Sequence, residues 1–273
     1  MINWEWTEKD HEFLYELCEK LRDEVSFAFS RWGDGEWTTL THDHPAFDEE
    51  DETGMTELLS DHVSGVSINE KFHMVDTLHD LQKEGKANID GNIYYQDLGK
   101  RLKEIVSVEQ DYYMGYMNTP FTTVEGVPIH DVMKKEYHQE WVNSDILHGM
   151  SGLQGLEYIF ELLEPIHVVY VGNESFRSLP FINEFIEIPY LNVWHDYENT
   201  LDRIKQTLDD TIHKTFLFSA GMATNVFIDD LWKCNKNNTY MDVGSVFDPY
   251  VGRKTRGYHN VLKDVKVFSN ENI

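Results

Sequence analysis

FAFSRWGDGEW, from Phe27 to Trp37, combines a run typical of a buried β-strand with an acidic turn. From Val25 onward, large apolar side chains alternate with small ones, so both faces of this strand can be covered, as in a parallel sheet. Gly33 and Gly35 then bracket Asp34. Glycine allows positive φ angles and lets a ligand approach the backbone closely. The stretch therefore predicts a strand over residues 25–30 that leads into a ligand-binding turn.

The turn presents groups that suit a metal ion and a phosphate. Asp34 and Glu36 place two carboxylates two residues apart, next to Arg31. Carboxylate oxygens are preferred ligands of Mg²⁺ and Mn²⁺, and guanidinium binds phosphate oxygens in pairs. We predict a metal site at Asp34 and Glu36, flanked by Arg31, Gly33 and Gly35, which would hold one end of a diphosphate. The structural alternative is an ordinary turn in which an acidic residue complements a helix N-terminus.

Length and composition suit a globular protein of one large domain or two small ones. The chain has 273 residues, 41% hydrophobic and 13% aromatic, which is enough for a packed core. We expect a single domain over 1–273. No apolar run approaches the roughly 20 residues of a membrane span, and the acidic N-terminus lacks a signal-peptide core. Cys18 and Cys234 form no disulfide framework. These features predict a cytoplasmic protein.

The chain is strongly acidic. It has 23 basic and 49 acidic residues, a formal net charge of −26, which argues against nucleic acid or an anionic membrane as partner. Residues 43–57 contain seven acids and no lysine or arginine. This segment reads as a solvated acidic loop inserted after the turn, with a lid over the site as the alternative.

Helical and strand-like patterns alternate along the chain. Apolar periodicity predicts helices over residues 7–24, 58–63, 72–83, 96–106, 132–143, 153–163, 197–211 and 223–233. After the first strand, short apolar runs predict strands over 112–116, 166–171, 185–188, 215–218 and 240–243. The order predicts an α/β fold with a Rossmann-like, mostly parallel sheet and helices on both faces.

Several of the predicted strands end in a polar or glycine-containing turn: GDGE, VGNES, FSAGM and DVGS. Open α/β sheets bind ligands at the carboxyl ends of their strands. We therefore expect one crevice to collect the side chains and backbone of Asp34, Glu36, Asn173, Ser219, Gly221 and Asp242. None of the turns is a G-x-G-x-x-G or Walker loop, so each taken alone fits an ordinary strand-to-helix turn.

A basic block follows the last strand. The segment DVGSVFDPYVGRKTRGYHN, residues 242–260, contains Arg253, Lys254, Arg256 and His259. Arginine suits bidentate phosphate contacts, so the block is a candidate clamp for a diphosphate or an anionic acceptor. The alternative is a solvated tail that pairs with the acidic surface.

The run SRWGDGEW resembles the R-x-G-D-G-E motif of the GT-D fold glycosyltransferases, a Rossmann-like family. The resemblance continues more loosely through QDLGKRLKEI, VVYVGNESFRSLPF, IPYLNVWHDY, FLFSAGMATNVFIDDL and MDVGSVFDPYVGRKTRGYH. It implies a nucleotide-sugar donor, typically a UDP-sugar, a glycan or other hydroxyl acceptor, and a divalent metal at Asp34 and Glu36. The sequence departs from the family in its acidic insert and in ending DVGS rather than D-I-G-H.

In a glycosyl transfer reaction, each candidate residue would have a distinct role. The metal, Mn²⁺ or Mg²⁺, would neutralise the diphosphate leaving group, with cationic support from Arg31 and Arg256. An inverting reaction needs a base, and the candidates are Asp242, Asp248 and His259. Trp194 is a candidate for stacking on the donor, although core packing is its alternative role. The rival functions are a metal-dependent phosphoesterase and a non-catalytic nucleotide- or glycan-binding module.

Overall fold

The computed structural model describes residues 6–33, 36, 96–105, 110–116, 141–152, 156–189, 193–256, 259, 262 and 265–269. The expected helices over 58–63 and 72–83 lie outside this part of the chain, as do the acidic segment 43–57 and the turn residues Asp34 and Gly35. The single-domain organisation stays a prediction.

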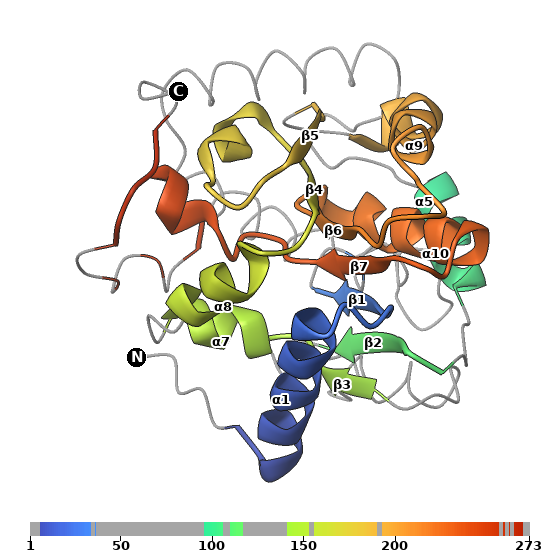
Figure 1. Ribbon diagram of the computed structural model, residues 1–273. Coiled ribbons are helices and arrows are strands. Elements are labelled where there is room, and N and C mark those ends of the chain that lie inside the picture. The colour runs from blue at the N-terminus through green and yellow to red at the C-terminus, as the bar shows by residue number, and fades with distance from the viewer. Residues whose placement is uncertain are drawn as a thin grey trace, which may run out of the picture.

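A seven-stranded sheet organises the described residues (Figure 1). Its order is β3-β2-β1-β7-β6-β4-β5, and every strand pair is parallel. The strands are β1 (Ala28–Trp32), β2 (Tyr112–Tyr116), β3 (Trp141–Asn143), β4 (Val168–Gly172), β5 (Glu184–Glu187), β6 (Thr215–Phe218) and β7 (Thr239–Asp242). The predicted α/β class with a Rossmann-like sheet is confirmed.

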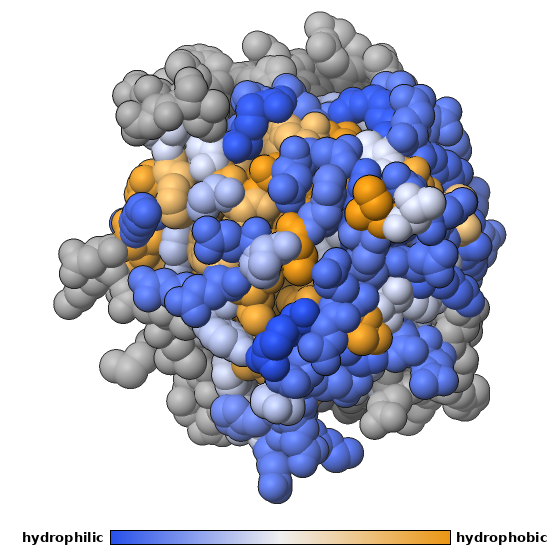
Figure 2. Space-filling view, viewed as in Figure 1, coloured by the Kyte–Doolittle hydropathy of each residue, from blue (hydrophilic) through white to orange (hydrophobic). Residues whose placement is uncertain are grey.

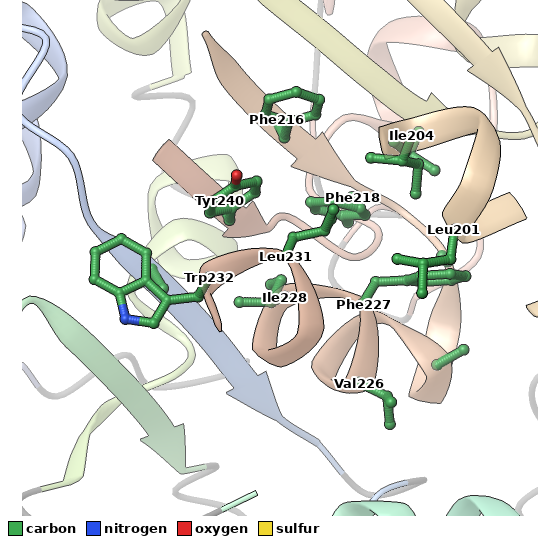
Figure 3. Close-up of a cluster of buried hydrophobic side chains, with 14 of the residues drawn as sticks. Leu201, Ile204, Phe216, Phe218, Val226, Phe227, Ile228, Leu231, Trp232 and Tyr240 are labelled. Atoms are coloured by element: carbon green, nitrogen blue, oxygen red, sulfur yellow. The ribbon is translucent and has the colours of Figure 1, made fainter. Parts of the chain in front are cut away.

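Helices cover both faces of the sheet, as the buried strands require (Figure 1). One face carries α5 (Gln96–Glu104), α9 (Tyr197–Lys205) and α10 (Thr224–Cys234), and the other α1 (Glu8–Arg22), α7 (Ile146–Gly152) and α8 (Leu156–Leu163). Figure 3 shows the first core, where Phe227 and Leu231 of α10 lie among Phe218 of β6, Tyr240 of β7 and Leu201 of α9. Most of the face in Figure 2 is hydrophilic.

The N-terminal helix α1 has the cap and the buried apolar face that its sequence predicts. Thr7 and Asp10 form the expected capping box: the Thr7 hydroxyl accepts from the Asp10 N–H at 3.3 Å, and the Asp10 carboxylate accepts from the Thr7 N–H at 2.7 Å. The predicted apolar stripe is buried against the sheet through Phe13, Leu17, Cys18 and Leu21.

Val25 lies outside the first strand, contrary to the prediction. Glu24 adopts a φ of 50°, and the Val25 N–H donates to the Lys20 carbonyl at 2.8 Å. Val25 therefore belongs to the turn that ends α1, and 45% of it is exposed. The strand begins instead at Ala28.

Three further elements differ from the prediction. Residues 141–143 form β3 beside β2 and not a helix end, because the aromatic and β-branched Trp141 and Val142 suit a strand. The short helix α7 follows directly and was not predicted. Helix α9 ends at Lys205, where the Thr207 hydroxyl donates to the Ile204 carbonyl at 2.7 Å and competes with continuation of the helix.

The strand order reverses between β1 and β7. Strands β2 and β3 are added in sequence on one side of β1. The chain then crosses to the other side of β1, where β4 to β7 lie. The β1–β7 ladder ends at Phe29↔Met241, whereas β1 pairs with β2 as far as Trp32 and β7 pairs with β6 as far as Asp242. The two central strands thus stop pairing at their carboxyl ends, the place where open α/β sheets bind ligands.

Among the described residues, no helix is both long enough and apolar enough to cross a membrane.

Candidate active site at the carboxyl ends of β1 and β7

Three charged residues meet where β1 and β7 stop pairing. Arg31 is the fourth residue of β1, Glu36 follows that strand, and Asp242 is the last residue of β7. Only 7% of Glu36 and 4% of Asp242 is exposed. Both Arg31 and Glu36 act electrostatically on the Asp242 carboxyl group. The sheet therefore brings together residues that are more than 200 positions apart in the chain.

Asp242 is held in an unusual protonation range. Burial raises the pKa of its carboxyl group to about 7, and the negative charge of Glu36 adds to this, whereas Arg31 and the N–H of Gly244 oppose it. The Gly244 N–H donates to Asp242 Oδ1 at 2.9 Å. A carboxyl group that titrates near neutral pH is suited to general acid–base chemistry.

The Glu36 side chain accepts a backbone hydrogen bond from the residue that follows β1. Its Oε2 accepts the N–H of Gly33 at 2.8 Å, which fixes the turn after β1. A second buried carboxyl group, that of Asp242, lies within electrostatic reach of Glu36. Oxygen ligands of this kind suit a divalent cation. No group of three or more His, Cys, Asp or Glu side chains that could hold a metal occurs within the described ranges. Asp34 is not among those residues, so the predicted Asp34–Glu36 metal pair stays a prediction.

Gly244 allows the Arg31 side chain to lie against the turn that follows β7. Its φ is 48°, and a Cβ atom at this position would stand 3.0 Å from Arg31 Nη2. A larger residue would therefore meet both backbone strain and the guanidinium.

Replacing Gly244 with Ala should destabilise the fold by about 1 kcal/mol, because alanine is disfavoured at positive φ. It should also displace Arg31 and so weaken the binding of a diphosphate probe such as UDP. Gly252→Ala is the matched control: its φ is 78°, but its Cβ would only reach ordinary contact with Val267 at 3.5 Å. Urea unfolding and calorimetric titration of both variants separate the effects. Equal binding by the two variants would mean that Arg31 does not need this turn.

Ser219 joins the ends of three strands. Its hydroxyl donates to the Gly244 carbonyl at 2.6 Å and lies 2.7 Å from the Tyr170 hydroxyl. Gly221 has a φ of 59°, and among the described residues no heavy atom beyond its own chain neighbours lies within 4 Å of where its Cβ would stand. Ser219 thus ties the end of β6 to β4 and to the turn after β7, and a side chain at position 221 would find open space. Their predicted donor contacts stay predictions.

Asn173 and Trp194 are already used by the fold. Asn173 is the N-cap of η2 (Glu174–Ser178), where its Oδ1 accepts from the Ser175 N–H at 3.1 Å. Trp194 of η3 (Val193–Asp196) packs against the α10-side core, with its ring 4.8 Å from that of Tyr197. These contacts match the structural alternatives for both residues, and their donor roles remain predictions.

The two arginines of the basic block make contacts in different parts of the fold. Arg256 reaches the crevice, where its Nε donates to the Ser245 hydroxyl at 3.3 Å. Arg253 reaches η2 instead, donating to Ser175 Oγ at 3.3 Å and lying over the Phe176 ring. Lys254 is exposed. Within the basic block, Arg256 is therefore the cation that lies nearest the candidate site.

Two of the candidate bases have their acceptor atoms engaged. His259 is fully buried, and its Nδ1 accepts from the N–H groups of Thr255 and Arg256 at 3.1 and 3.2 Å. Burial and the cations nearby, Arg256 first, lower the pKa of His259 to about 4. Asp248, at the start of η5 (Asp248–Val251), accepts from the Thr255 hydroxyl. Both residues hold the basic block in shape, whereas Asp242 is a carboxyl group whose pKa burial raises to about 7.

His148 on α7 was not identified from the sequence. It is 4% exposed, and its Nε2 lies 3.4 Å from the Ser245 hydroxyl, the same hydroxyl that Arg256 contacts. No motif marks it, because its place in the site depends on a short helix that packs in from another part of the chain.

Solved structures share this fold. Two structures of domain of unknown function 1792, one of them selenomethionine-substituted, match 95% of this chain and 91% of theirs, with a TM-score of 0.52 and 14% sequence identity. That domain is described as having a distinct glycosyltransferase fold. The chain has this glycosyltransferase fold. Its sequence matches no protein-family model and no curated protein.

Proposed function

We propose that this protein is a metal-dependent glycosyltransferase that moves a sugar from a nucleotide sugar to a hydroxyl acceptor. The observation that carries the proposal is the meeting of Arg31, Glu36 and Asp242 where β1 and β7 stop pairing, in a sheet with a glycosyltransferase fold. The GDGE resemblance supports a UDP-sugar as donor and a glycan as one class of acceptor.

The metal would be Mn²⁺ or Mg²⁺, held by Asp34 and Glu36. The buried Glu36 carboxylate fits such an ion, because it lies near a second carboxylate and gives oxygen ligands to the crevice. When bound, the ion would neutralise charge on the departing diphosphate.

The chain's own residues would carry the other steps. Arg31 and Arg256 would bind the diphosphate oxygens, which offsets the long-range repulsion between an anionic donor and a chain of net charge −26. Asp242 would accept the proton of the acceptor hydroxyl at a carboxylate oxygen, because its pKa of about 7 leaves it both ionised and basic at neutral pH.

A panel of nucleotide sugars with Mn²⁺ tests this function. We expect slow donor hydrolysis that releases UDP and depends on the metal. Release of inorganic phosphate from phosphate esters would favour the phosphoesterase. Donor binding without any release would favour the non-catalytic module.

Replacing Arg256 with Ala should weaken UDP binding by about 1.5–3 kcal/mol, the range for a hydrogen bond to a charged group. Arg253→Ala is the comparison variant and should cost under about 1 kcal/mol, because Arg253 is engaged at η2. Calorimetric titration of UDP into each variant measures both. Unchanged affinity in Arg256→Ala would remove the basic block from the donor site.

A further inference from the structure

His148 occupies a fixed position at the wall of the crevice. Helix α7 begins just after β3, and the Asn143 side chain closes the intervening turn by accepting the Asp145 N–H at 2.8 Å. The Ser144 N–H donates to the Tyr116 carbonyl at 2.9 Å and ties this turn to the end of β2. Only 4% of His148 is exposed. The imidazole is therefore placed by the carboxyl ends of β2 and β3.

Ser245 links His148 to the basic block. Its hydroxyl lies 3.4 Å from His148 Nε2 and accepts from Arg256 Nε at 3.3 Å. Both contacts are satisfied when the hydroxyl donates to Nε2. The neighbouring Gly244 lies against the Arg31 guanidinium. One short turn after β7 is therefore next to His148 and to both arginines.

Positive charge surrounds this imidazole. Burial lowers the pKa of His148 well below its usual value, and Arg31 of β1, Arg256 and His259 of the C-terminal segment lower it further. Besides burial, the side chains that shift the pKa of His148 most are thus basic ones. An anion between the arginines would reverse this balance and stabilise the imidazolium.

We infer that His148, Arg31 and Arg256 form one binding site for the phosphate groups of a ligand, and that His148 takes up a proton from solvent when the site fills. Protonated His148 would then donate to a phosphate oxygen. The identification of that ligand as a nucleotide sugar rests on the proposed function; the site itself requires only a phosphate-like anion.

His259 is a poorer proton acceptor in the same cluster. Its Nδ1 already accepts two backbone N–H groups, so only its other ring nitrogen could change its hydrogen bonding without opening the turn. Ser245 can rotate to accept from a protonated His148 without any backbone change. His148 is therefore the group expected to respond to the ligand.

The test is calorimetric titration of metal-free protein in two buffers of different ionisation enthalpy. UDP-glucose is the first probe, because its diphosphate has no proton to exchange near neutral pH. Sulfate is the second, as a simple anion without a nucleoside. We expect proton uptake with both probes, and an affinity that rises by up to about tenfold per unit fall in pH between 8 and 6.

His148→Asn should remove the proton uptake and the pH dependence. His167→Asn is the matched control, because His167 pairs with Glu184 at 2.7 Å near the start of β4 and should keep both properties. Ser245→Ala covers the case in which His148→Asn does not fold. It removes the hydroxyl that contacts both His148 Nε2 and Arg256 Nε, and should change the amount of proton uptake.

Each outcome decides the inference. Absence of proton uptake in the wild type, equal uptake in His148→Asn, or failure of both probes to bind would overturn it. If sulfate binds with proton uptake but UDP-glucose does not bind, the phosphate site stands and the proposed donor fails. If UDP-glucose is turned over but binds without proton uptake, the proposed function stands and this inference fails.

Discussion

Asp34→Asn combined with Glu36→Gln should reduce metal-dependent release of UDP from the donor by at least about 100-fold, the scale seen when one electrostatic contact to a developing charge is removed. The two changes keep the side-chain shapes but remove both negative charges. Glutamine can still accept the Gly33 N–H that Glu36 accepts at 2.8 Å, so the turn should survive. The free energy of unfolding should change little, because the two substitutions remove charge and leave the packing of the side chains unchanged.

A matched pair of acids elsewhere makes this result specific. Asp97 and Glu104 of α5 are 83% and 62% exposed at their side chains, so Asp97→Asn with Glu104→Gln removes the same two charges far from β1. That control should keep wild-type UDP release and metal dependence. Full activity in the Asp34–Glu36 variant would mean that these carboxylates hold no catalytic metal. Equal loss in both variants would indicate a general effect of net charge.

The sheet and much of its ligand-binding edge could be predicted from local patterns. Short apolar runs such as 215–218 are long enough to identify a buried strand, and the polar residue after each run marks the carboxyl edge. Because parallel strands all end at one edge, Glu36 and Asp242 were expected to gather there, and the structure places Glu36 within electrostatic reach of Asp242, together with Arg31.

Other features depend on contacts that no local pattern encodes. Strand β3 has three residues and α7 has seven, which is too short for a clear period, and both are stabilised by packing against β2 and α8. Without α7 in place, His148 is an ordinary histidine. The sequence also treats Asp248 and His259 as equal to Asp242, whereas their hydrogen bonds to Thr255 engage them in the turn.

Asp242→Asn should have opposite effects on activity and stability. As the proposed base, Asp242 should be worth about 10²–10⁴-fold in the transfer rate, and the wild-type rate should rise with pH through the neutral range as its carboxyl group ionises. Asp229→Asn is the control for a buried aspartate. Asp229 is 1% exposed and pairs with Lys233 on α10, so this variant should keep its activity.

The sign of the stability effect follows from the pKa of Asp242. That pKa rises from 3.8 in the unfolded chain to about 7 in the fold, so the folded state binds the extra proton and its stability falls as pH rises between these values. Above pH 7 the buried charge costs its full amount. Asparagine removes that charge and its Oδ1 can still accept the Gly244 N–H, so metal-free Asp242→Asn should be more stable than wild type by at least about 2 kcal/mol. The difference should vanish below about pH 4. Urea unfolding at pH 4, 6 and 8 measures it; a variant that is less stable at pH 8 would show that Arg31 and Gly244 more than offset the cost of burial.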